Sequence, residues 1–582
     1  MFLFAITKTP IIHRFPSFAV KQIYLNSFIV SIVTDNFLAN YVLTQTGFKI
    51  VESPLICSSR FTDIVYSEVK YTQKIDRFNI YNSVHSGRPI YYHCNSKGDF
   101  FCSTHISHLK RAGVSIEENY DVLPEFFVYR FIMPPQTLYK NIKQLPPGNL
   151  LNVNPTSDKC SIIEAEQYNP LAGRNDVEVD SFHEISGKTL ELLHQSIGKL
   201  APVKDKIAVL LSGGLDSSIL FKLCLDKYNL STSYSTGYPF ENPKENIEKE
   251  YAMSAARAFG TKHIYHEVSE IDYFHGFIEA ISVAEVPVHH LQSIMLYLLF
   301  KGGIPETKDI VLLGEGADSI SGSSLHGKLF KSGKITCKIL SNYPFYQAMK
   351  LASWITGKGS VFLETLKIGR KPAALSDPDN IVWSLGAYGS ESWACEYFGV
   401  SKEDIIKDRY ENIKRYENES LLDILTVVGL FGEGYVSQSI WSKIGESQKK
   451  IAYYPFYDPE LIGYLFSLPW RLKLRHPKNI LRGTARKLQV PEFIITRPKS
   501  SFGLQVQGWS ERGGIFEPLV ALATKVFDLN QIMRMKSTDP KKAMTFWNIL
   551  NYSIWKRLCI DDEPTEVLRE ELKKQFRDKV KI

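Results

Sequence analysis

The chain has 582 residues, of which 44% are hydrophobic, 12% aromatic and 23% charged, and its formal net charge is +7. This length exceeds what one hydrophobic core organises, so two or three domains are expected. The composition is typical of a folded protein and excludes extensive disorder. The small net charge leaves room for anionic ligands but does not predict a nucleic-acid partner.

The eight cysteines are scattered along the chain, with no CxxC pair among them and no pair of histidines beside them in the sequence. This spacing predicts reduced, buried thiols and favours neither a disulfide framework nor a zinc site. The first residues, MFLFAITKTPIIHRF, are interrupted by Lys8, Pro10 and His13 and make a poor signal peptide. No run approaches the ~20 apolar residues of a membrane span, so we expect a cytoplasmic protein.

About the first 150 residues show the period-two alternation and the turn punctuation of short strands. Strands are expected at 22–34, 89–94 and 99–104, with a turn at 95–98. Polar, turn-forming residues at 169–176 then precede a helical pattern at 181–200. The predicted division of the chain is a front domain at 1–175, a second domain at 180–560 and a charged, exposed helical tail at 561–582.

In the second domain, strand and helix alternate. An apolar run at 206–211 suits a buried parallel strand. Further strands are expected at 232–236, 263–268 and 309–313, and helices at 216–227 and 248–259. This alternation is typical of a doubly wound parallel sheet. Beyond Ser319 the pattern is mostly helical.

The turn between the first of these strands and its helix carries candidate nucleotide-binding residues. They are Leu211, Ser212, Gly213, Gly214, Leu215, Asp216, Ser217 and Ser218. Glycines allow positive φ, so successive N–H groups can surround an anion at the positive end of the following helix. The serines add donors, and Asp216 adds a carboxylate for a cation. The sequence is not a GxxxxGK[ST] loop, and an ordinary turn without a ligand is the alternative.

A second cluster of glycines and acids, Gly314-Glu315-Gly316-Ala317-Asp318, follows the strand expected at 309–313. Ligands of an open parallel sheet lie beyond the carboxyl ends of its strands. Asp318 and Asp216 can therefore face one another across a shared cleft, close to Gly314, and hold Mg²⁺ between phosphates. Two unrelated surface acids at helix N-termini are the alternative.

Two basic segments form a third group: 478–482 (KNILR) and 497–503 (RPKSSFG). Their lysines, Lys478 and Lys499, could stabilise the negative charge that develops on phosphate oxygens in a closed site. A solvated helix face is the usual explanation of an isolated KxxLR. Ser500, Ser501 and Gly503 suggest a loop that closes over the site.

These motifs resemble those of one family, from about residue 80 to the low 500s. SGGLDSS at 212–218 resembles the pyrophosphate-binding loop (PP-loop) of enzymes that adenylate carbonyl groups with ATP. GEGAD is similar to the GEGSDE stretch of asparagine synthetases, and the basic segments are similar to motifs of asparagine and β-lactam synthetases. The sequence departs at Ser319, where asparagine synthetases carry a second acid.

The resemblance implies roles for individual residues. Lys499 corresponds to the catalytic lysine near the transition state, and Lys478 to a residue that meets pyrophosphate. Glu315 stands where β-lactam-forming relatives carry a tyrosine that takes part in deprotonating the attacking nitrogen, and asparagine synthetases also have glutamate there. ATP and Mg²⁺ are the implied cofactors, with Asp216 and Asp318 as metal ligands.

The front domain resembles that of the same family, and 126–152 looks like the stretch that closes it. The implied fold is an N-terminal-nucleophile (Ntn) hydrolase-like αββα sandwich, followed by a doubly wound α/β PP-loop synthetase domain with a helical C-terminal part. In glutamine-dependent members the mature chain begins with the nucleophilic cysteine. Here Phe2 follows Met1, and the first cysteine is Cys57. We therefore expect a degenerate amidotransferase domain without glutaminase activity, as in β-lactam synthetases and lasso-peptide cyclases.

One departure concerns the substrate. Asparagine synthetases carry an SLExRxPFLD segment near the substrate pocket, and here only 454–458 (YPFYD) matches its end. Tyr453 stands where the arginine is expected. A bidentate partner for a carboxylate is then missing, which argues against aspartate as the substrate.

The leading hypothesis is an AMP-forming amide ligase that activates a small-molecule or peptide carboxylate and joins it to an amine. Closure within one molecule, as in lactam or lasso-peptide formation, fits the missing amidase, and a peptide cyclase would imply a maturation protease as partner. Amidation of aspartate or a related acid by ammonia is the second hypothesis. An RNA-modifying PP-loop enzyme, which needs a basic, aromatic surface, and an inactive scaffold are alternatives from other classes. The sequence has no cluster of Lys and Arg residues near the predicted loops, and such a cluster would be needed to favour a nucleic-acid substrate.

Overall fold

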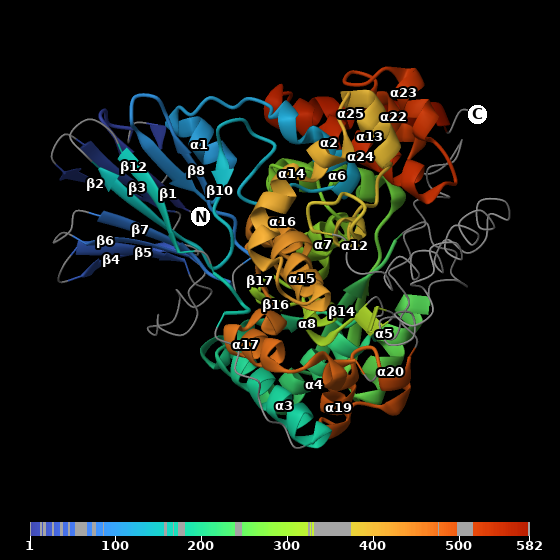
Figure 1. Cartoon of the computed structure of the whole chain (residues 1–582). Coiled ribbons are helices and arrows are strands. Elements are labelled where there is room, and N and C mark those ends of the chain that lie inside the picture. Colours follow the sequence, from blue (N-terminus) through green and yellow to red (C-terminus); the bar gives the residue numbers. More distant parts are fainter. Residues whose placement is uncertain are drawn as a thin grey trace.

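The computed structural model covers two domains that pack against one another (Figure 1). The residues that it describes are 2–11, 14–15, 19–25, 28–34, 39–44, 47–52, 67–72, 77–84, 87–155, 160–166, 168–172, 181–238, 247–323, 326–327, 329–330, 374–474, 476–497 and 516–579. None of the helices in these ranges is long and apolar enough to cross a lipid bilayer.

The front domain is a sandwich of two six-stranded antiparallel sheets, on the left of Figure 1. In spatial order the first sheet contains β10 (Lys143–Gln144), β8 (Tyr91–Cys94), β9 (Phe100–Ser103), β1 (Phe2–Thr7), β3 (Phe28–Thr34) and β2 (Ala19–Leu25). The second contains β12 (Cys160–Glu166), β11 (Leu150–Pro155), β7 (Arg77–Asn82), β6 (Ser67–Thr72), β5 (Gly47–Glu52) and β4 (Ala39–Thr44).

Apolar side chains fill the space between the two sheets. Phe4 of the first sheet packs on Phe78 of the second, with ring centroids 5.1 Å apart, and on Phe100 of its own sheet at 6.4 Å. Along β7 and β11, buried residues alternate with more exposed ones, because successive side chains of a strand point to opposite faces. The helix α1 (Ile106–Ala112) packs against β9. This layered arrangement agrees with the sandwich expected for the front domain.

The strands predicted at 89–94 and 99–104 correspond to β8 and β9. The segment 22–34, predicted as strand throughout, is instead part of a hairpin in which β2 and β3 pair antiparallel, with Leu25 opposite Phe28. The alternation of apolar residues is similar in both arms of a hairpin, so the pattern alone did not reveal the reversal of the chain.

The second domain is built on a parallel sheet. β13 (Ile207–Val209), β16 (Ile310–Leu312) and β17 (Ile451–Tyr453) pair in that order, and β14 (Thr232–Thr236) pairs with β15 (Lys262–His266). A parallel bridge between Leu210 and Tyr234 joins the two groups. The resulting order is β15-β14-β13-β16-β17, so the chain builds one half of the sheet outward from β13 and then returns to β16. Such a switch point is where doubly wound sheets bind ligands.

Helices connect and surround these strands (Figure 1). Those up to residue 321 are α2 (Leu123–Tyr129), α3 (Phe182–Gly198), α4 (Leu215–Tyr228), α5 (Ile247–Ala258), α6 (Glu270–Ala284), α7 (Gln292–Leu298) and α8 (Ala317–Ser321). The later helices are α12 (Ile381–Ser384), α13 (Glu391–Phe398), α14 (Lys402–Ile413), α15 (Leu421–Val428), α16 (Tyr435–Ser447), α17 (Pro459–Ser467), α18 (Trp470–Lys473), α19 (Asn479–Lys487), α20 (Glu492–Thr496), α22 (Glu517–Ala523), α23 (Leu529–Met535), α24 (Pro540–Trp555) and α25 (Thr565–Lys579).

The predicted strands and helices of the parallel sheet agree with the observed elements to within a few residues. β17 is the exception, because the region beyond Ser319 was read as mostly helical and a strand of three residues has too little pattern to detect. The charged tail forms α25, and Leu568 and Leu572 on one side of this helix are buried.

Buried hydrogen bonds and ion pairs lie where the front domain meets the second domain. Glu285, after α6, accepts hydrogen bonds from the backbone N–H groups of Ile106 (2.8 Å) and Ser107 (2.9 Å) at the start of α1. The ammonium group of Lys443 in α16 lies 2.5 Å from the same carboxylate. Arg88 and Glu446 form a second buried pair at 2.7 Å. The backbone N–H groups at the start of α1 therefore have their hydrogen-bond acceptor in the other domain.

Candidate active site

A cavity of about 720 Å³ opens beyond the carboxyl ends of the central parallel strands. Ten of the predicted site residues line it: Leu211, Ser212, Gly214, Leu215, Asp216, Ser217, Gly314, Glu315, Asp318 and Lys478. Gly213 and Ser218, the other two predicted residues of the glycine turn, are not part of its wall. Residues from β13, β16 and α19, far apart in sequence, therefore meet at the switch point of the sheet.

Hydrogen bonds within the glycine turn hold its shape. The hydroxyl of Ser217 accepts from the backbone N–H of Ser212 (3.2 Å) and lies 3.1 Å from the Ser212 hydroxyl, which accepts from the N–H of Gly214 (3.3 Å). Gly213 has a φ of +71°, and a Cβ atom there would lie 2.5 Å from the backbone of Tyr251 in α5. Only glycine fits at this position, because a side chain meets both left-handed strain and a backbone clash.

The helix α4 starts immediately after the turn, with Gly214 as the residue before its first turn and no side chain capping it. The first N–H groups of a helix have no partner within the helix, and the helix dipole adds positive potential at that end. Leu215, Asp216 and Ser217 of this first turn line the cavity. The loop and the helix start together can hold the oxygens of a phosphate group.

The two predicted metal-binding carboxylates lie on either side of one ammonium group. Lys478 pairs with Asp216 and also lies 3.0 Å from Asp318. Burial opposes the charge of Lys478, but the two carboxylates dominate and raise its pKa. Lys478 itself has a left-handed backbone (φ +54°) just before α19. A non-glycine residue rarely adopts this conformation, and here it directs the lysine between the two acids.

Glu315 lies in the same cavity on the loop after β16. Its pKa is raised from 4.5 to about 7 by burial and by the negative charges of Asp318 and Glu433. A group with this pKa exchanges protons near neutral pH, which suits a general base. Next to it Gly316 has a φ of +90°, and a Cβ atom there would lie 2.4 Å from the ring of Tyr457.

The second basic segment reaches the glycine turn through Arg497. Its guanidinium group donates to the backbone carbonyl of Ser212 (3.4 Å), pairs with Glu248 at 2.6 Å and stacks over the ring of Tyr251 at 3.6 Å. Lys499, two residues further on, lies outside the described residues, as do Ser500, Ser501 and Gly503. Its predicted role therefore stays a prediction, although its chain neighbour is anchored at the cavity.

A cluster that the sequence did not predict lines another part of the cavity: Arg130, His290, Tyr388 and Glu433, with His289 directly behind. Arg130 comes from the front domain, where it ends α2 in a left-handed conformation (φ 67°). The guanidinium group is fully buried, lies over the ring of Tyr388 at 3.8 Å and is 3.6 Å from Glu433. The members of this cluster lie as much as hundreds of residues apart in the sequence, so no local motif indicates them. Only the adjacent His289-His290 pair can be recognised in the sequence.

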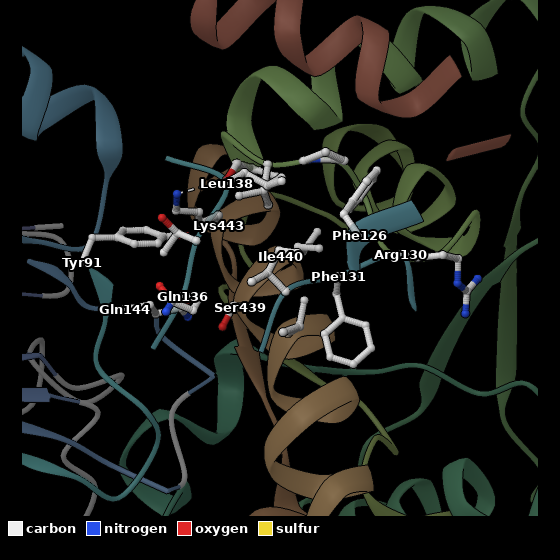
Figure 2. A pocket seen from close by; sticks show the side chains of 16 residues that line it. Tyr91, Phe126, Arg130, Phe131, Gln136, Leu138, Gln144, Ser439, Ile440 and Lys443 are labelled. Atoms are coloured by element: carbon white, nitrogen blue, oxygen red, sulfur yellow. Dashed lines mark hydrogen bonds between the residues drawn. The ribbon is translucent and has the colours of Figure 1, made fainter. Parts of the chain in front are cut away.

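Arg130 also borders a smaller, mostly apolar cavity of about 50 Å³ between the two domains. Figure 2 shows that Phe131 and Ile440 line this space and that the guanidinium group of Arg130 extends away from it. Tyr91 of the front domain and Lys443 of α16 lie at the other end. The front domain therefore shapes both cavities.

Tyr453 does not line the large cavity. It is fully buried in β17, and its hydroxyl donates to the backbone carbonyl of Ser196 in α3 at 3.1 Å. The side chain at this position therefore points to the opposite side of the sheet from the predicted nucleotide site. Tyr453 therefore makes no contact with a substrate in the cavity, and the argument against aspartate stays a prediction.

Two family models match the chain. The model described as "Asparagine synthase" matches residues 188–525, more than half of the chain, and the "Glutamine amidotransferase domain" model matches residues 65–165. A putative glutamine-hydrolysing asparagine synthetase of Mycobacterium tuberculosis H37Rv is 21% identical over 481 residues, covering 77% of this chain and 69% of the relative. Asparagine synthetase 1 of Bacillus subtilis, also described as glutamine-hydrolysing, is 20% identical over 493 residues, covering 81% and 74%.

Proposed function

The chain belongs to the asparagine synthase family and is an ATP-dependent carbon–nitrogen ligase; from this premise we propose that it adenylates a substrate carboxylate and closes an amide bond within one molecule. A lactam or a lasso-peptide macrolactam would be such a product. The observation that carries the proposal is the meeting of the glycine turn, Asp216, Asp318, Lys478 and Glu315 in one cavity.

In the first step, a carboxylate oxygen of the substrate attacks the α-phosphorus of ATP, and the bond to the bridging oxygen of pyrophosphate breaks. The N–H groups of the glycine turn and of α4 lie where they can hold the departing pyrophosphate. Lys478 can neutralise its charge. Asp216 and Asp318 are the oxygen donors that Mg²⁺ prefers, and the ion would compensate phosphate charge there.

In the second step, an amine attacks the acyl carbon of the adenylate, AMP leaves and the nitrogen loses a proton. Glu315 is the candidate acceptor of this proton, because its raised pKa of about 7 allows it to be charged and still basic at neutral pH. The acceptor and the phosphate-binding groups share one cavity, so both steps can follow without release of the adenylate.

The choice of an internal amine is supported by the front domain. β1 begins with Phe2, which is buried, and the backbone N–H of Phe2 bonds to the hydroxyl of Thr104 at 3.4 Å. Cys160 is one of the cysteines described in this domain. Burial raises the pKa of its thiol to about 12, which keeps the thiol protonated and unreactive. We propose that the domain releases no ammonia from glutamine and instead helps to hold the substrate. A peptide substrate would make a maturation protease a partner.

Amidation of aspartate or a related acid by free ammonia is the second candidate, because the relatives are described as asparagine synthetases. The two candidates separate in one assay, in which the full-length protein is incubated with ATP, Mg²⁺, aspartate and ammonium. Formation of asparagine would exclude an obligatory cyclase. AMP and pyrophosphate formed only with an amine-bearing acid or peptide would support closure within one molecule, and ADP as product would contradict the adenylation mechanism.

The matched variants for this assay lie on one helix. Asp216→Ala removes a carboxylate from the cavity, and we expect the exchange of pyrophosphate into ATP to fall by at least about 10²-fold. Asp226→Ala, further along α4 and paired with Lys222 in a surface ion pair, leaves the exchange unchanged. Equal rates for the wild type and Asp216→Ala would exclude the proposed site.

A further inference from the structure

Three side chains at the edge of the large cavity bring one ligand atom each to a common point. His289 and His290 follow α6, and Glu433 lies in the turn Gly429–Gly434 before α16. The three atoms lie within 4.8 Å of one another. The Glu433 oxygen Oε1 is 3.3 Å from Nε2 of His289 and 3.8 Å from Nε2 of His290. Ligands about 2.0–2.2 Å from a tetrahedral ion are separated by roughly 3.3–3.5 Å, so both distances are close to those of a metal site.

The hydrogen bonds of His289 determine which of its nitrogens is free to bind. Nδ1 lies 2.9 Å from the hydroxyl of Ser437, and that hydroxyl donates its single proton to the backbone carbonyl of Glu433 at 3.1 Å. The hydroxyl must therefore accept from His289, which places the imidazole proton on Nδ1. A lone pair then remains on Nε2, and this atom is fully buried without a hydrogen-bond partner. A fixed tautomer of this kind is the usual support of a metal-binding histidine.

His290 and Glu433 complete the arrangement. Both rings lie inside the protein, and burial favours the neutral imidazole, which keeps a lone pair for an ion. On His289 a lone pair faces a carboxylate oxygen without a shared proton, and a cation between them would remove the repulsion. His290 and Glu433 line the large cavity, which leaves a fourth position open to a ligand.

We propose that His289, His290 and Glu433 bind a divalent transition-metal ion of the zinc type, with its open position toward the substrate cavity. Two imidazoles and one carboxylate form a set that zinc uses where one position stays open. The site is separate from the oxygen donors Asp216 and Asp318, which suit Mg²⁺. It contains no thiolate, so the scattered cysteines gave no indication of it.

Arg130 provides the sharpest test of the proposal, because its positive charge repels a metal cation bound at Glu433. The NH2 atom of Arg130 lies 3.6 Å from the same oxygen of Glu433, and its Nε and NH2 atoms have no hydrogen-bond partner. In a metal site, loss of this positive charge strengthens binding of the ion. In a cluster that is only a salt bridge, loss of Arg130 weakens the cluster and creates no affinity for metal.

The experiment uses the full-length protein, stripped of metal and titrated with Co²⁺ in the presence of millimolar Mg²⁺. Visible absorption bands of Co²⁺ report a site of four or five ligands that includes nitrogen. We expect one Co²⁺ per chain, displaced by Zn²⁺. His289→Ala and Glu433→Gln weaken binding at least about 10-fold, and Ser437→Ala, which leaves all three ligands in place, weakens it by about 10–100-fold. Arg130→Met strengthens it.

Asp318→Asn is the matched control for the second cation site, and it leaves Co²⁺ binding unchanged. Circular dichroism shows that each variant is folded, and Ser437→Ala carries the test if His289→Ala does not fold. Absence of Co²⁺ binding by the wild type, binding that survives both His289→Ala and Glu433→Gln, or weaker binding by Arg130→Met would each overturn the proposal. None of these readouts requires amide-bond formation, so the result is independent of the proposed function.

Discussion

Glu285 at the contact between the domains is buried and Glu315 in the wall of the large cavity is partly buried, yet the pKa values of their carboxyl groups shift in opposite directions. Burial raises the pKa of Glu285, but Lys443, with smaller contributions from His105 and Ser107, outweighs it and holds the pKa at about 2. Burial also raises the pKa of Glu315, and there the neighbours Asp318 and Glu433 add to the effect, which brings it to about 7.

The difference separates a structural carboxylate from a reactive one. Glu285 has a cation and two helix N–H groups as partners, so its charge is compensated and its proton is lost at all physiological pH values. Glu315 lies among like charges, and its protonation changes near pH 7. Perturbed groups of the second kind are concentrated at functional sites. Substitutions that remove a partner should therefore reduce stability in the first region and activity in the second.

The largest expected effect is on stability at the domain contact. Lys443→Met removes the cation and leaves Glu285 buried, at a cost of about 3–5 kcal/mol in the free energy of unfolding. A decrease in the urea midpoint measures it, and Lys301→Met, in an exposed pair with Glu279, is the control with an effect below about 1 kcal/mol. Because the pKa of Glu285 is lowered, its contribution is present above pH 4.5 and is lost as the pH falls toward 2. Equal midpoints for the two variants would contradict the comparison.

A smaller effect is expected in the pH dependence of amide formation. If Glu315 accepts the proton of the amine, the rate rises through a pKa of about 7 and is roughly 100-fold lower at pH 5 than on the plateau. Glu315→Gln removes this limb. Exchange of pyrophosphate into ATP, which precedes the amine step, serves as the internal control and should not follow the same limb. A variant that keeps the wild-type profile would assign the proton acceptor to another group.

The sequence predicted the parallel sheet and the loops that follow its central strands well, because both depend on local patterns. Apolar runs bounded by glycine predicted β13 and β16, and the glycines after them indicated where backbone must approach a ligand. The rule that ligands lie beyond the carboxyl ends of strands then brought Asp216 and Asp318 together before any contact was known. The resemblance assigned Lys478 to pyrophosphate, and its position between the two acids was not predicted.

The cluster around Glu433 could not be predicted in the same way. Arg130 reaches it from the front domain, and Tyr388 and Glu433 arrive from segments hundreds of residues later. Such contacts depend on how two domains pack, which no periodicity in the sequence records. The orientation of Tyr453 could not be predicted either, since a motif fixes a position in a strand but the pleat decides which side its side chain faces.

Two glycines with similar backbone conformations sharpen the comparison between the cavity and the rest of the molecule. Gly213 in the binding turn and Gly260 after α5 have φ values of +71° and +67°, but a Cβ atom at Gly260 meets nothing within 4 Å. Gly260→Ala should cost about 1–2 kcal/mol for the left-handed conformation alone. Gly213→Ala adds a clash with the backbone of Tyr251, so it should also weaken ATP binding by about 10-fold, measured by calorimetry. Equal ATP affinities would show that the turn does not bind the nucleotide.

The smallest effect tests the orientation of Tyr453. Tyr453→Phe removes the hydroxyl that donates to Ser196 and leaves that buried carbonyl with one bond fewer, which costs about 1 kcal/mol in the free energy of unfolding. The affinity for the acid substrate and the rate of AMP formation should stay at the wild-type values, because the side chain faces α3 and lies outside the cavity. Tyr457→Phe is a useful contrast, since the hydroxyl of Tyr457 donates to the backbone carbonyl of Leu430, in the turn that carries Glu433. A change in substrate affinity for Tyr453→Phe as large as that for Tyr457→Phe would place position 453 at the substrate after all.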